Sequence, residues 1–493
     1  MTALAKVRES ASSAARKSLD VQIAFSIGDA AFAQSKDCAK DETLTLALAS
    51  APAMLIANDR RHACAFKCMM PGTRFPHPSL ARRLIARNRR DALTFWRRMT
   101  ARSHPIRRDY SIRREHLSPA MFPPVVVAIP AQNEEQNIAA CFRAIAMQER
   151  SSGAKLLGRI GVICFVNGTQ DATYAVACAE AERFGLPSRI LDAQMAPHAA
   201  HAGGARRATM DCAADWLEEG GHTAGLLFTT DADSVPASDW VVAARRAFSR
   251  GVHGVAGPID LHSEDEVTLP PHVRARGALE AQYDALITEM FARLDPRPHD
   301  PWPCHATEAG ANLAVTLAAY RLIGGLPHCV CGEDRALCAA IEAHGLRVRH
   351  DLAPRVSTSG RLIGRAQGGV ADTLRLRSEE PDAVCDPYLE PAWNARFRAL
   401  WRGRSRAAFD KARGLPRAGV IGTPDMQRKT GASFHDLWSA IETSDPRLAR
   451  KFLRPADLPE QIAIAEAIVR RLRPKRSGLQ SGRGGNPQFV PAE

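Results

Sequence analysis

The stretch TTDADSVPASDW, residues 229–240, is the part of the sequence from which the fold is inferred. The apolar run 224–228 leads into it, and residues 240–248 after it have the spacing of a short helix. A buried strand that ends in Asp231 and Asp233 explains this pattern. Because side chains alternate along a strand, carboxylates at positions i and i+2 point the same way. Hard divalent cations prefer such oxygen ligands, so the stretch predicts a metal site, although Asp in this pattern is also common in turns and caps.

Strand-like and helix-like segments alternate on either side of this stretch. The expected strands are residues 125–131, 160–167, 188–193, 224–228 and 254–261, and the expected helices are residues 132–148, 168–185, 203–221 and 240–248. Alternation at this length indicates an α/β domain with a mostly parallel sheet and helices on both faces. Ligands of such sheets bind at the carboxyl ends of the strands. The segments IPAQNEE, VNGTQD and DADS follow three of these strands and are expected to meet at one edge.

The length of 493 residues allows two or three domains. We expect four parts: a basic, poorly ordered N-terminal arm (1–115), the α/β domain (116–375), a helical C-terminal region (376–473) and a disordered tail (474–493). A further hypothesis is that translation begins near Met121, directly before the first clear strand.

The sequence contains no signal for a membrane or for an oxidising compartment. It has no run of 18 or more apolar residues, so no transmembrane segment is expected. The charged N-terminus lacks the features of a secretory signal, and the 12 cysteines are scattered without a CxxC pair. A cytoplasmic location is the resulting expectation.

The net charge of +13 is concentrated in one segment. Residues 71–115 hold 13 arginines, no lysine and three acids, and so contribute a net charge of +10. Because this segment lies outside the motifs that carry the chemistry, no nucleic-acid partner is expected. A basic nucleic-acid-binding protein, with this segment as its binding element, is an alternative.

Five motifs, in this order within residues 123–375, resemble those of the inverting family 2 glycosyltransferases, which have the GT-A fold. They are IPAQNEE (129–135), VNGTQDAT (166–173), DADS (231–234), GANLAV with AYRLIGGLP (310–327) and GED (332–334). The resemblance implies a metal-dependent enzyme that moves a sugar from a UDP- or GDP-sugar donor to an acceptor hydroxyl with inversion. It implies Mg²⁺ or Mn²⁺ as the cofactor, and it leaves the acceptor unidentified.

The resemblance also implies roles for individual residues. The donor-binding residues of the first three motifs would be Pro130, Ala131, Asn133, Glu134, Asn167 and Asp231. Asp233, with Asp231 beside it, would bind the metal ion that bridges the diphosphate. Glu333 or Asp334 would be the base that deprotonates the acceptor, with Asp334 preferred. Both acids would otherwise serve only to stabilise the start of a helix.

The expected phosphate contacts depart from the family pattern. Many members have a lysine ahead of the metal strand, but no lysine occurs here between Lys155 and Lys411. Guanidinium groups can replace it, because they bind phosphate oxygens in a bidentate way. The candidates are Arg206 or Arg207 in the block HAGGARRAT, and Arg361 and Arg365 in a later loop.

The acceptor side and a third metal ligand are assigned by position. Loop 295–310, with Trp302, His305 and Glu308, is expected to shape the acceptor pocket. His350 is a candidate for the third metal ligand, although a single His in a strand is more often structural.

Two other enzyme classes fit the sequence less well. A nucleotidyltransferase of related fold is an alternative, but it would begin with a Gly-rich, Lys-bearing loop where this chain has IPAQNEE. A phosphatase-like enzyme of the haloacid dehalogenase class would need a lysine between DADSV and the later acid pair, where this chain has none, and a nucleophile on its first strand and not its fourth.

Overall fold

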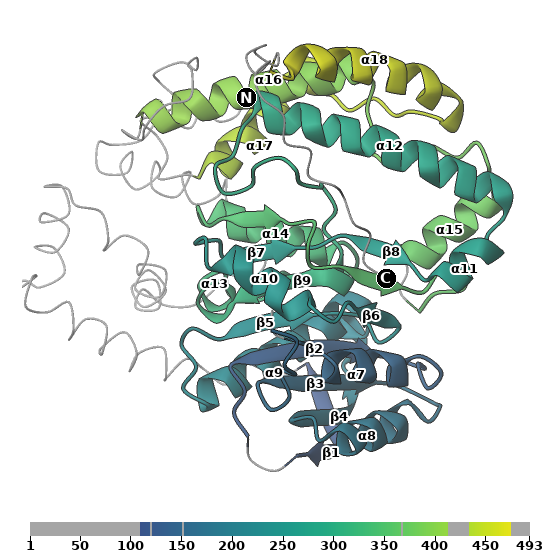
Figure 1. Cartoon of the computed structure of the whole chain (residues 1–493), viewed down its shortest axis with the longest axis vertical. Coiled ribbons are helices and arrows are strands. Elements are labelled where there is room, and N and C mark those ends of the chain that lie inside the picture. Colours follow the sequence, from purple (N-terminus) through teal and green to yellow (C-terminus); the bar gives the residue numbers. More distant parts are fainter. Residues whose placement is uncertain (1–108, 119–120, 150–151, 366–367, 413–432, 475–493) are drawn as a thin grey trace, which may run out of the picture. The chain divides into compact units, whose positions relative to one another are not determined.

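The computed structural model describes residues 109–118, 121–149, 152–365, 368–412 and 433–474 (Figure 1). All of them belong to one compact unit, Ile106–Glu493. The expected arm before residue 109 and the expected tail after residue 474 lie outside the described residues.

An eight-stranded sheet has the strand order β1-β4-β3-β2-β5-β9-β7-β10. Its strands are β1 (Tyr110–Leu117), β2 (Val125–Ala131), β3 (Ile160–Asn167), β4 (Ser188–Met195), β5 (Leu226–Thr229), β7 (Gly254–Ala256), β9 (Leu313–Thr316) and β10 (Val348–His350). Six of the eight run in one direction, and β1 and β9 run against them. The expected α/β fold with a mostly parallel sheet is therefore confirmed.

Helices cover both faces of this sheet, as expected. One face carries α7 (Ile138–Ala146), α8 (Thr173–Phe184) and α10 (Trp240–Phe248), and the other carries α9 (Ala202–Glu219), α13 (Leu317–Leu322) and α14 (Glu333–Ala343). Strand β2 shows the reason: Val125, Val127 and Ile129 pack into the first core, whereas Val126 and Ala128 pack into the second. A strand buried on both faces requires such an unbroken apolar run.

A second sheet has three short strands in the order β6-β11-β8. They are β6 (Ser234–Pro236), β8 (Ile259–Leu261) and β11 (Val356–Thr358). The single strand expected at residues 254–261 is wrong, because β7 joins the large sheet and β8 joins the small one. The chain changes sheets at Gly257, where an added Cβ would lie 2.2 Å from the carbonyl oxygen of Pro354. This close backbone approach requires glycine.

The helical C-terminal region is also confirmed. It comprises α15 (Val370–Glu379), α16 (Ala392–Ala412), α17 (Phe434–Ser444) and α18 (Leu458–Leu472). It shares a core with α12 (Pro271–Leu294), which follows the short helix α11 (Ser263–Thr268); this core includes Tyr283, Met290, Ala395 and Leu458. Figure 1 shows α12, α16 and α18 side by side. Helix α12 therefore connects the α/β domain to the helical region.

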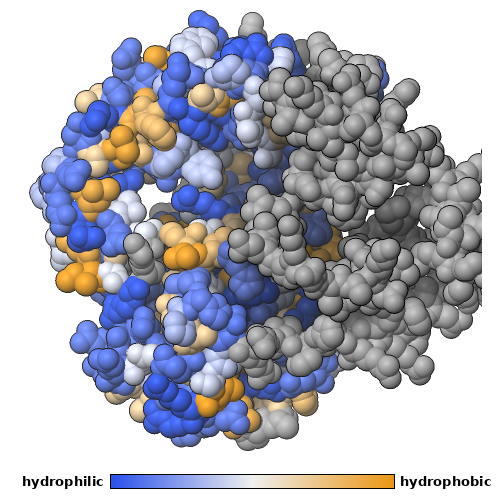
Figure 2. Space-filling view, turned by 180° about the vertical axis from the view of Figure 1, so that it is seen from behind, coloured by the Kyte–Doolittle hydropathy of each residue, from blue (hydrophilic) through white to orange (hydrophobic). Residues whose placement is uncertain are grey.

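The described surface is that of an ordinary globular unit. On the face shown in Figure 2 it is mainly hydrophilic, and its apolar residues lie in small separate groups. Among the described residues, no helix combines the length and the hydropathy that crossing a bilayer requires.

Strand β1 changes the expected domain boundary. It lies within the range assigned to the arm and before Met121, yet it pairs with β4 from Tyr110↔Met195 to Leu117↔Arg189. The α/β domain therefore includes residues before 116, and a chain that began at Met121 would lack this edge strand. The sequence YSIRREHL did not indicate a strand because most of its side chains are exposed and three of these are charged, as is common in edge strands.

Candidate functional site

The carboxyl ends of the central strands bring the motifs to one edge of the large sheet. Thr229, at the end of β5, pairs with Ala128 of β2 and with Leu313 of β9. Leu313 pairs with Ala256 of β7, which in turn pairs with His350 of β10. The loops that follow β2, β3, β5 and β10 therefore leave the sheet along one line, where ligands of α/β sheets bind.

Hydrogen bonds tie the first two motifs to each other. The amide of Asn133 donates to the hydroxyl of Thr169 (3.2 Å), and Asn133 Oδ1 accepts from the amide of Gln170 (2.9 Å). The amide of Glu134 donates to the hydroxyl of Thr173 (2.7 Å). Asn133 has a φ of 55°, which Asn adopts more readily than most residues. The side chain of Asn133 therefore fixes the shape of the loop.

Three of the expected donor-binding residues lie at the base of these loops. Ala131 and Asn167 are buried, and Pro130 is half-buried. Asn167 Oδ1 accepts a hydrogen bond from the amide of Met195 at 3.2 Å. This oxygen therefore joins the ends of β3 and β4 in this structure.

A buried arginine connects the DADS motif to the acid pair. Arg206, in the first turns of α9, donates from Nη2 to Asp231 Oδ1 (2.7 Å) and from Nε to Glu333 Oε1 (2.8 Å). Its Nη1 donates to the Thr229 hydroxyl (2.9 Å) and to the Gly310 carbonyl (3.0 Å). We expected Arg206 to bind donor phosphate, but each guanidinium nitrogen donates to protein. In this structure it therefore braces the two sets of acids against each other.

The two aspartates of the DADS motif do not lie on a strand. Strand β5 ends at Thr229, and the amide of Ser234 donates to the Asp231 carbonyl (3.1 Å) across a turn. Alternation along a strand therefore does not align these two side chains, and that prediction is wrong. Asp231 is paired with Arg206, whereas Asp233 Oδ2 lies 2.8 Å from Arg361 Nη2.

Asp233 is more deeply buried than Asp231. Its side chain is 11% exposed, against 36% for Asp231. Burial, and then the charge of Asp231, raise the pKa of Asp233 to about 6. Among the described residues, no group of three or more His, Cys, Asp or Glu side chains is arranged to hold a metal ion. A metal ion here would therefore need oxygens from a ligand in addition to the two aspartates.

Two arginines of the loop after β11 reach the same region, as their position suggested. Arg361 forms a bidentate pair with Glu134, from Nη1 at 3.0 Å and Nη2 at 2.8 Å, in addition to its contact with Asp233. Arg365 donates to the carbonyl of Asn133. This loop therefore links the first motif to the DADS motif.

Arg207, the other candidate beside Arg206, faces away from these carboxylates. It donates to the carbonyl oxygens of Gly324 (3.2 Å) and Leu326. Its guanidinium therefore holds the turn after α13.

The two acids at the start of α14 have different surroundings. Glu333 is buried against Arg206. Asp334 is half-buried and accepts hydrogen bonds from the amides of Gly310 (3.0 Å) and Arg335 (2.8 Å). Burial and the nearby charge of Glu333 raise the pKa of Asp334 despite these bonds. Asp334 therefore holds a proton more readily than an exposed aspartate would.

His350 does not have the environment of a metal ligand. Its Nδ1 lies 2.9 Å from Asp300 Oδ2 and its Nε2 lies 3.2 Å from Glu308 Oε1. Burial alone would lower its pKa, but these hydrogen bonds raise the pKa of His350 to about 9. Both ring nitrogens thus donate to carboxylates at neutral pH in this structure, which is the arrangement of a structural histidine.

Two residues of the site were missed in the sequence. Asp300 lies in a Pro-rich loop that carries no motif, and its hydrogen bond to His350 shows that it holds that ring in place. His262, at the end of β8, lies 3.1 Å from the carbonyl of Asp233. Neither could be found without the fold, because the contacts join segments far apart in the chain.

Comparison with known proteins gives matches in structure alone. No family model and no curated protein matches the chain. Solved structures of GT-A glycosyltransferases are similar to it. A mannosyltransferase from Pyrobaculum calidifontis in complex with GDP-Man and Mn²⁺ is 17% identical, with a TM-score of 0.35, over 76% of this chain and 93% of that chain.

Two further matches have comparable scores. TarS 1-349 from S. aureus, in complex with UDP, is 12% identical, with a TM-score of 0.32, over 73% of this chain and 95% of that chain. Glucosyl-3-phosphoglycerate synthase from Mycobacterium tuberculosis, in complex with Mn²⁺, UDP and phosphoglyceric acid, is 17% identical, with a TM-score of 0.29. The match covers 52% of this chain and 80% of that chain. At these identities the likeness is one of fold.

Proposed function

We propose that the chain is a metal-dependent glycosyltransferase that moves a sugar from a UDP- or GDP-sugar to an acceptor hydroxyl with inversion. The observation that carries the proposal is the ion-pair chain Asp231–Arg206–Glu333. It joins the aspartates that would face the diphosphate to the acid pair that would face the acceptor. Sugar transfer requires both groups to act on opposite sides of one sugar ring, so their fixed spacing supports this chemistry.

Asp334 is the proposed base, and Glu333, beside it in the sequence, pairs with Arg206. The acceptor hydroxyl would give its proton to the Asp334 carboxylate as its oxygen forms the new bond to the anomeric carbon. The bond from that carbon to the diphosphate breaks on the opposite face, and the electron pair leaves with the nucleoside diphosphate. The raised pKa of Asp334 supports this role, because a base works best when its pKa approaches the working pH.

Asp233 and Asp231 would hold Mg²⁺ or Mn²⁺ together with oxygens of the donor diphosphate. Two carboxylates with substrate phosphates form a usual site for Mg²⁺. When bound, the ion would neutralise the charge that develops on the departing diphosphate. The raised pKa of Asp233 supports the fit, because burial and the charge of Asp231 oppose its ionisation and a bound cation would favour it.

The first two motifs would hold the nucleotide. The residues concerned are Pro130, Ala131, Asn133, Glu134 and Asn167, of which Asn133 and Asn167 would act by shaping the loops. Arg361 and Arg365 would contribute positive charge near the diphosphate, since their loop already contacts Glu134 and Asp233.

Calorimetric titration of the full chain with UDP and with GDP, each with and without Mn²⁺, tests this proposal. We expect one nucleotide to bind in a Mn²⁺-dependent manner. The Asp233→Asn variant should lose the Mn²⁺ dependence. The matched control is Asp260→Asn, which removes an exposed acid of β8 that pairs with Arg355. This variant should bind the nucleotide as the wild type does.

Absence of binding by both nucleotides to the folded wild type would overturn the proposal. The products of turnover separate it from the nucleotidyltransferase alternative. A glycosyltransferase releases a nucleoside diphosphate, whereas a nucleotidyltransferase acting on a nucleoside triphosphate releases pyrophosphate.

A further inference from the structure

Residues 308–310, which we call the strap, connect a buried ionic cluster to the proposed base. At one end, Glu308 Oε1 lies 3.2 Å from His350 Nε2. At the other end, the amide of Gly310 donates to Asp334 Oδ2 (3.0 Å), and its carbonyl accepts from Arg206 (3.0 Å). An added Cβ at Gly310 would lie 2.5 Å from Arg206 Cζ, so glycine allows this close approach. The strap is therefore held at both ends by charged side chains.

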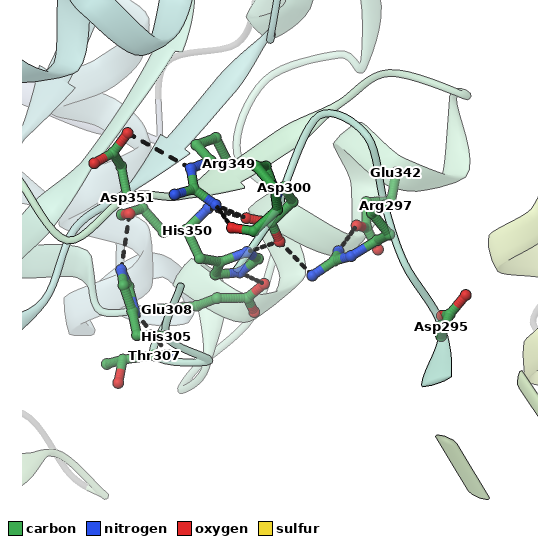
Figure 3. Close-up of polar contacts among 12 residues, drawn as sticks. Asp295, Arg297, Asp300, His305, Thr307, Glu308, Glu342, Arg349, His350 and Asp351 are labelled. Carbon is green, nitrogen blue, oxygen red and sulfur yellow. Dashed lines mark hydrogen bonds and ion pairs between the residues drawn. The ribbon is translucent and has the colours of Figure 1, made fainter. Parts of the chain in front are cut away.

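The cluster behind His350 is a rigid anchor (Figure 3). Asp300, whose side chain is 0% exposed, accepts from both Nδ1 and the amide of His350, each at 2.9 Å. Arg349 donates to the same carboxylate at 3.0 Å, and Arg297 pairs with it. The ring of His305 packs edge-on against His350, with centroids 5.6 Å apart. His350 therefore has little freedom to leave its contact with Glu308.

We infer that Glu308 and His350 are positioning residues that hold the strap so that the amide of Gly310 stays on Asp334. The inference rests on the proposed role of Asp334 as the base. Neither residue touches the reacting atoms in this scheme. Their effect reaches the base through one hydrogen bond, which stabilises the carboxylate form of Asp334 and fixes one of its oxygens.

The contact between His350 and Glu308 requires the imidazolium form. Nδ1 donates to Asp300, so Nε2 can donate to Glu308 only when the ring carries both protons. The charged and titratable groups that face the ring or influence it are Asp300, Glu308, Arg297, Arg349, His305, Asp351 and Glu342. The two carboxylates bonded to the ring outweigh its burial, so the contact persists at neutral pH.

The test measures the pKa of Asp334 in two ways in the full chain. One is the acid limb of the pH profile for hydrolysis of UDP-glucose or GDP-mannose. The other is carboxyl ¹³C NMR of Asp334, assigned with Asp334→Asn, which needs no activity. Glu308→Ala and His350→Ala should raise the pKa of Asp334 by about 0.7 pH unit, which lowers the rate on the acid limb about fivefold.

Two further variants separate the strap from other effects. Glu308→Gln keeps a side-chain oxygen that accepts from His350 Nε2, so it should retain the wild-type pKa of Asp334. Glu460→Ala removes an exposed acid from α18 and should also leave that pKa unchanged.

An unchanged pKa of Asp334 in Glu308→Ala would overturn the inference. So would a Glu308→Gln variant that matches Glu308→Ala, because the effect would then come from charge and not from the strap. If His350→Ala does not fold, the comparison of Glu308→Ala with Glu308→Gln tests the inference. Absence of donor hydrolysis by the wild type, with the NMR shift as expected, would count against the proposed function while the coupling of the strap to Asp334 stands.

Discussion

Replacement of Arg206 by Met should destabilise the protein strongly. Arg206 is 6% exposed and donates to Asp231, Glu333, Thr229 and Gly310. Methionine fills a comparable volume without charge, so Glu333, with a side chain 8% exposed, loses its cation. Leaving a buried charge without its partner costs about 3–5 kcal/mol. Asp231 is 36% exposed and can be screened by water, so it adds little to this loss.

Urea unfolding of the full chain measures the effect. We expect the free energy of unfolding to fall by about 3–5 kcal/mol in Arg206→Met. Adding Glu333→Gln to that variant should recover about 1–3 kcal/mol, because the second change removes the unpaired charge. Arg321→Met is the matched control, because Arg321 pairs with the exposed acids Asp215 and Glu218, and it should cost less than about 1 kcal/mol.

Two results would refute this reasoning. One is a loss of less than about 1 kcal/mol in Arg206→Met, the range of an exposed ion pair. The other is additivity of the two changes in the double variant, since residues that share one ion pair should not act independently.

Three further predictions concern single positions. Gly310→Ala should lower the free energy of unfolding by about 1–3 kcal/mol, because its Cβ would lie 2.5 Å from Cζ of Arg206. Gly277→Ala lies within α12, where an added Cβ has nothing within 4 Å, and it should raise the free energy of unfolding by about 0.5–1 kcal/mol. The opposite order in urea unfolding would contradict both predictions. Asp233→Asn should stabilise the metal-free protein at pH 7 by roughly 1–3 kcal/mol. The pKa of Asp233 is raised to about 6 in the folded state, so the folded state binds more protons than the unfolded state between about pH 4 and 6. The stability of the wild type therefore falls as pH rises through this window. This advantage should vanish below about pH 4, and a difference that does not depend on pH would show that the charge of Asp233 is not its cause. Arg361→Gln should weaken nucleotide binding about tenfold in calorimetry through loss of a charged hydrogen bond, and an unchanged affinity would remove Arg361 from the donor site.

The elements with the clearest local signals were predictable from the sequence. Strands β2 and β3 are unbroken apolar runs that can only be buried, and these runs indicated the parallel sheet. The loops after the strands could be assigned to one edge because parallel strands share a direction. Strand β1 could not be found in this way, because its charged side chains face water.

The roles of single charged residues could not be predicted in the same way. Arg206 and Arg207 are neighbours in sequence, yet one lies between Asp231 and Glu333 and the other holds the turn at Gly324. Successive residues of a helix point in different directions, and which direction faces the acids depends on how α9 packs on the sheet. His350 likewise gained its ionic partners from a loop some fifty residues earlier in the chain.

The three-stranded sheet gives the site a mechanical property. Asp233 immediately precedes β6, and Arg361 follows β11, which pairs with β6 along Thr358↔Ser234. A rigid-body displacement of this small sheet would carry Asp233 and Arg361 together, whereas Asp231 is anchored to α9 through Arg206. Such a motion would therefore change the distance between Asp231 and Asp233. The DADS turn, which joins the two aspartates, would take up such a displacement.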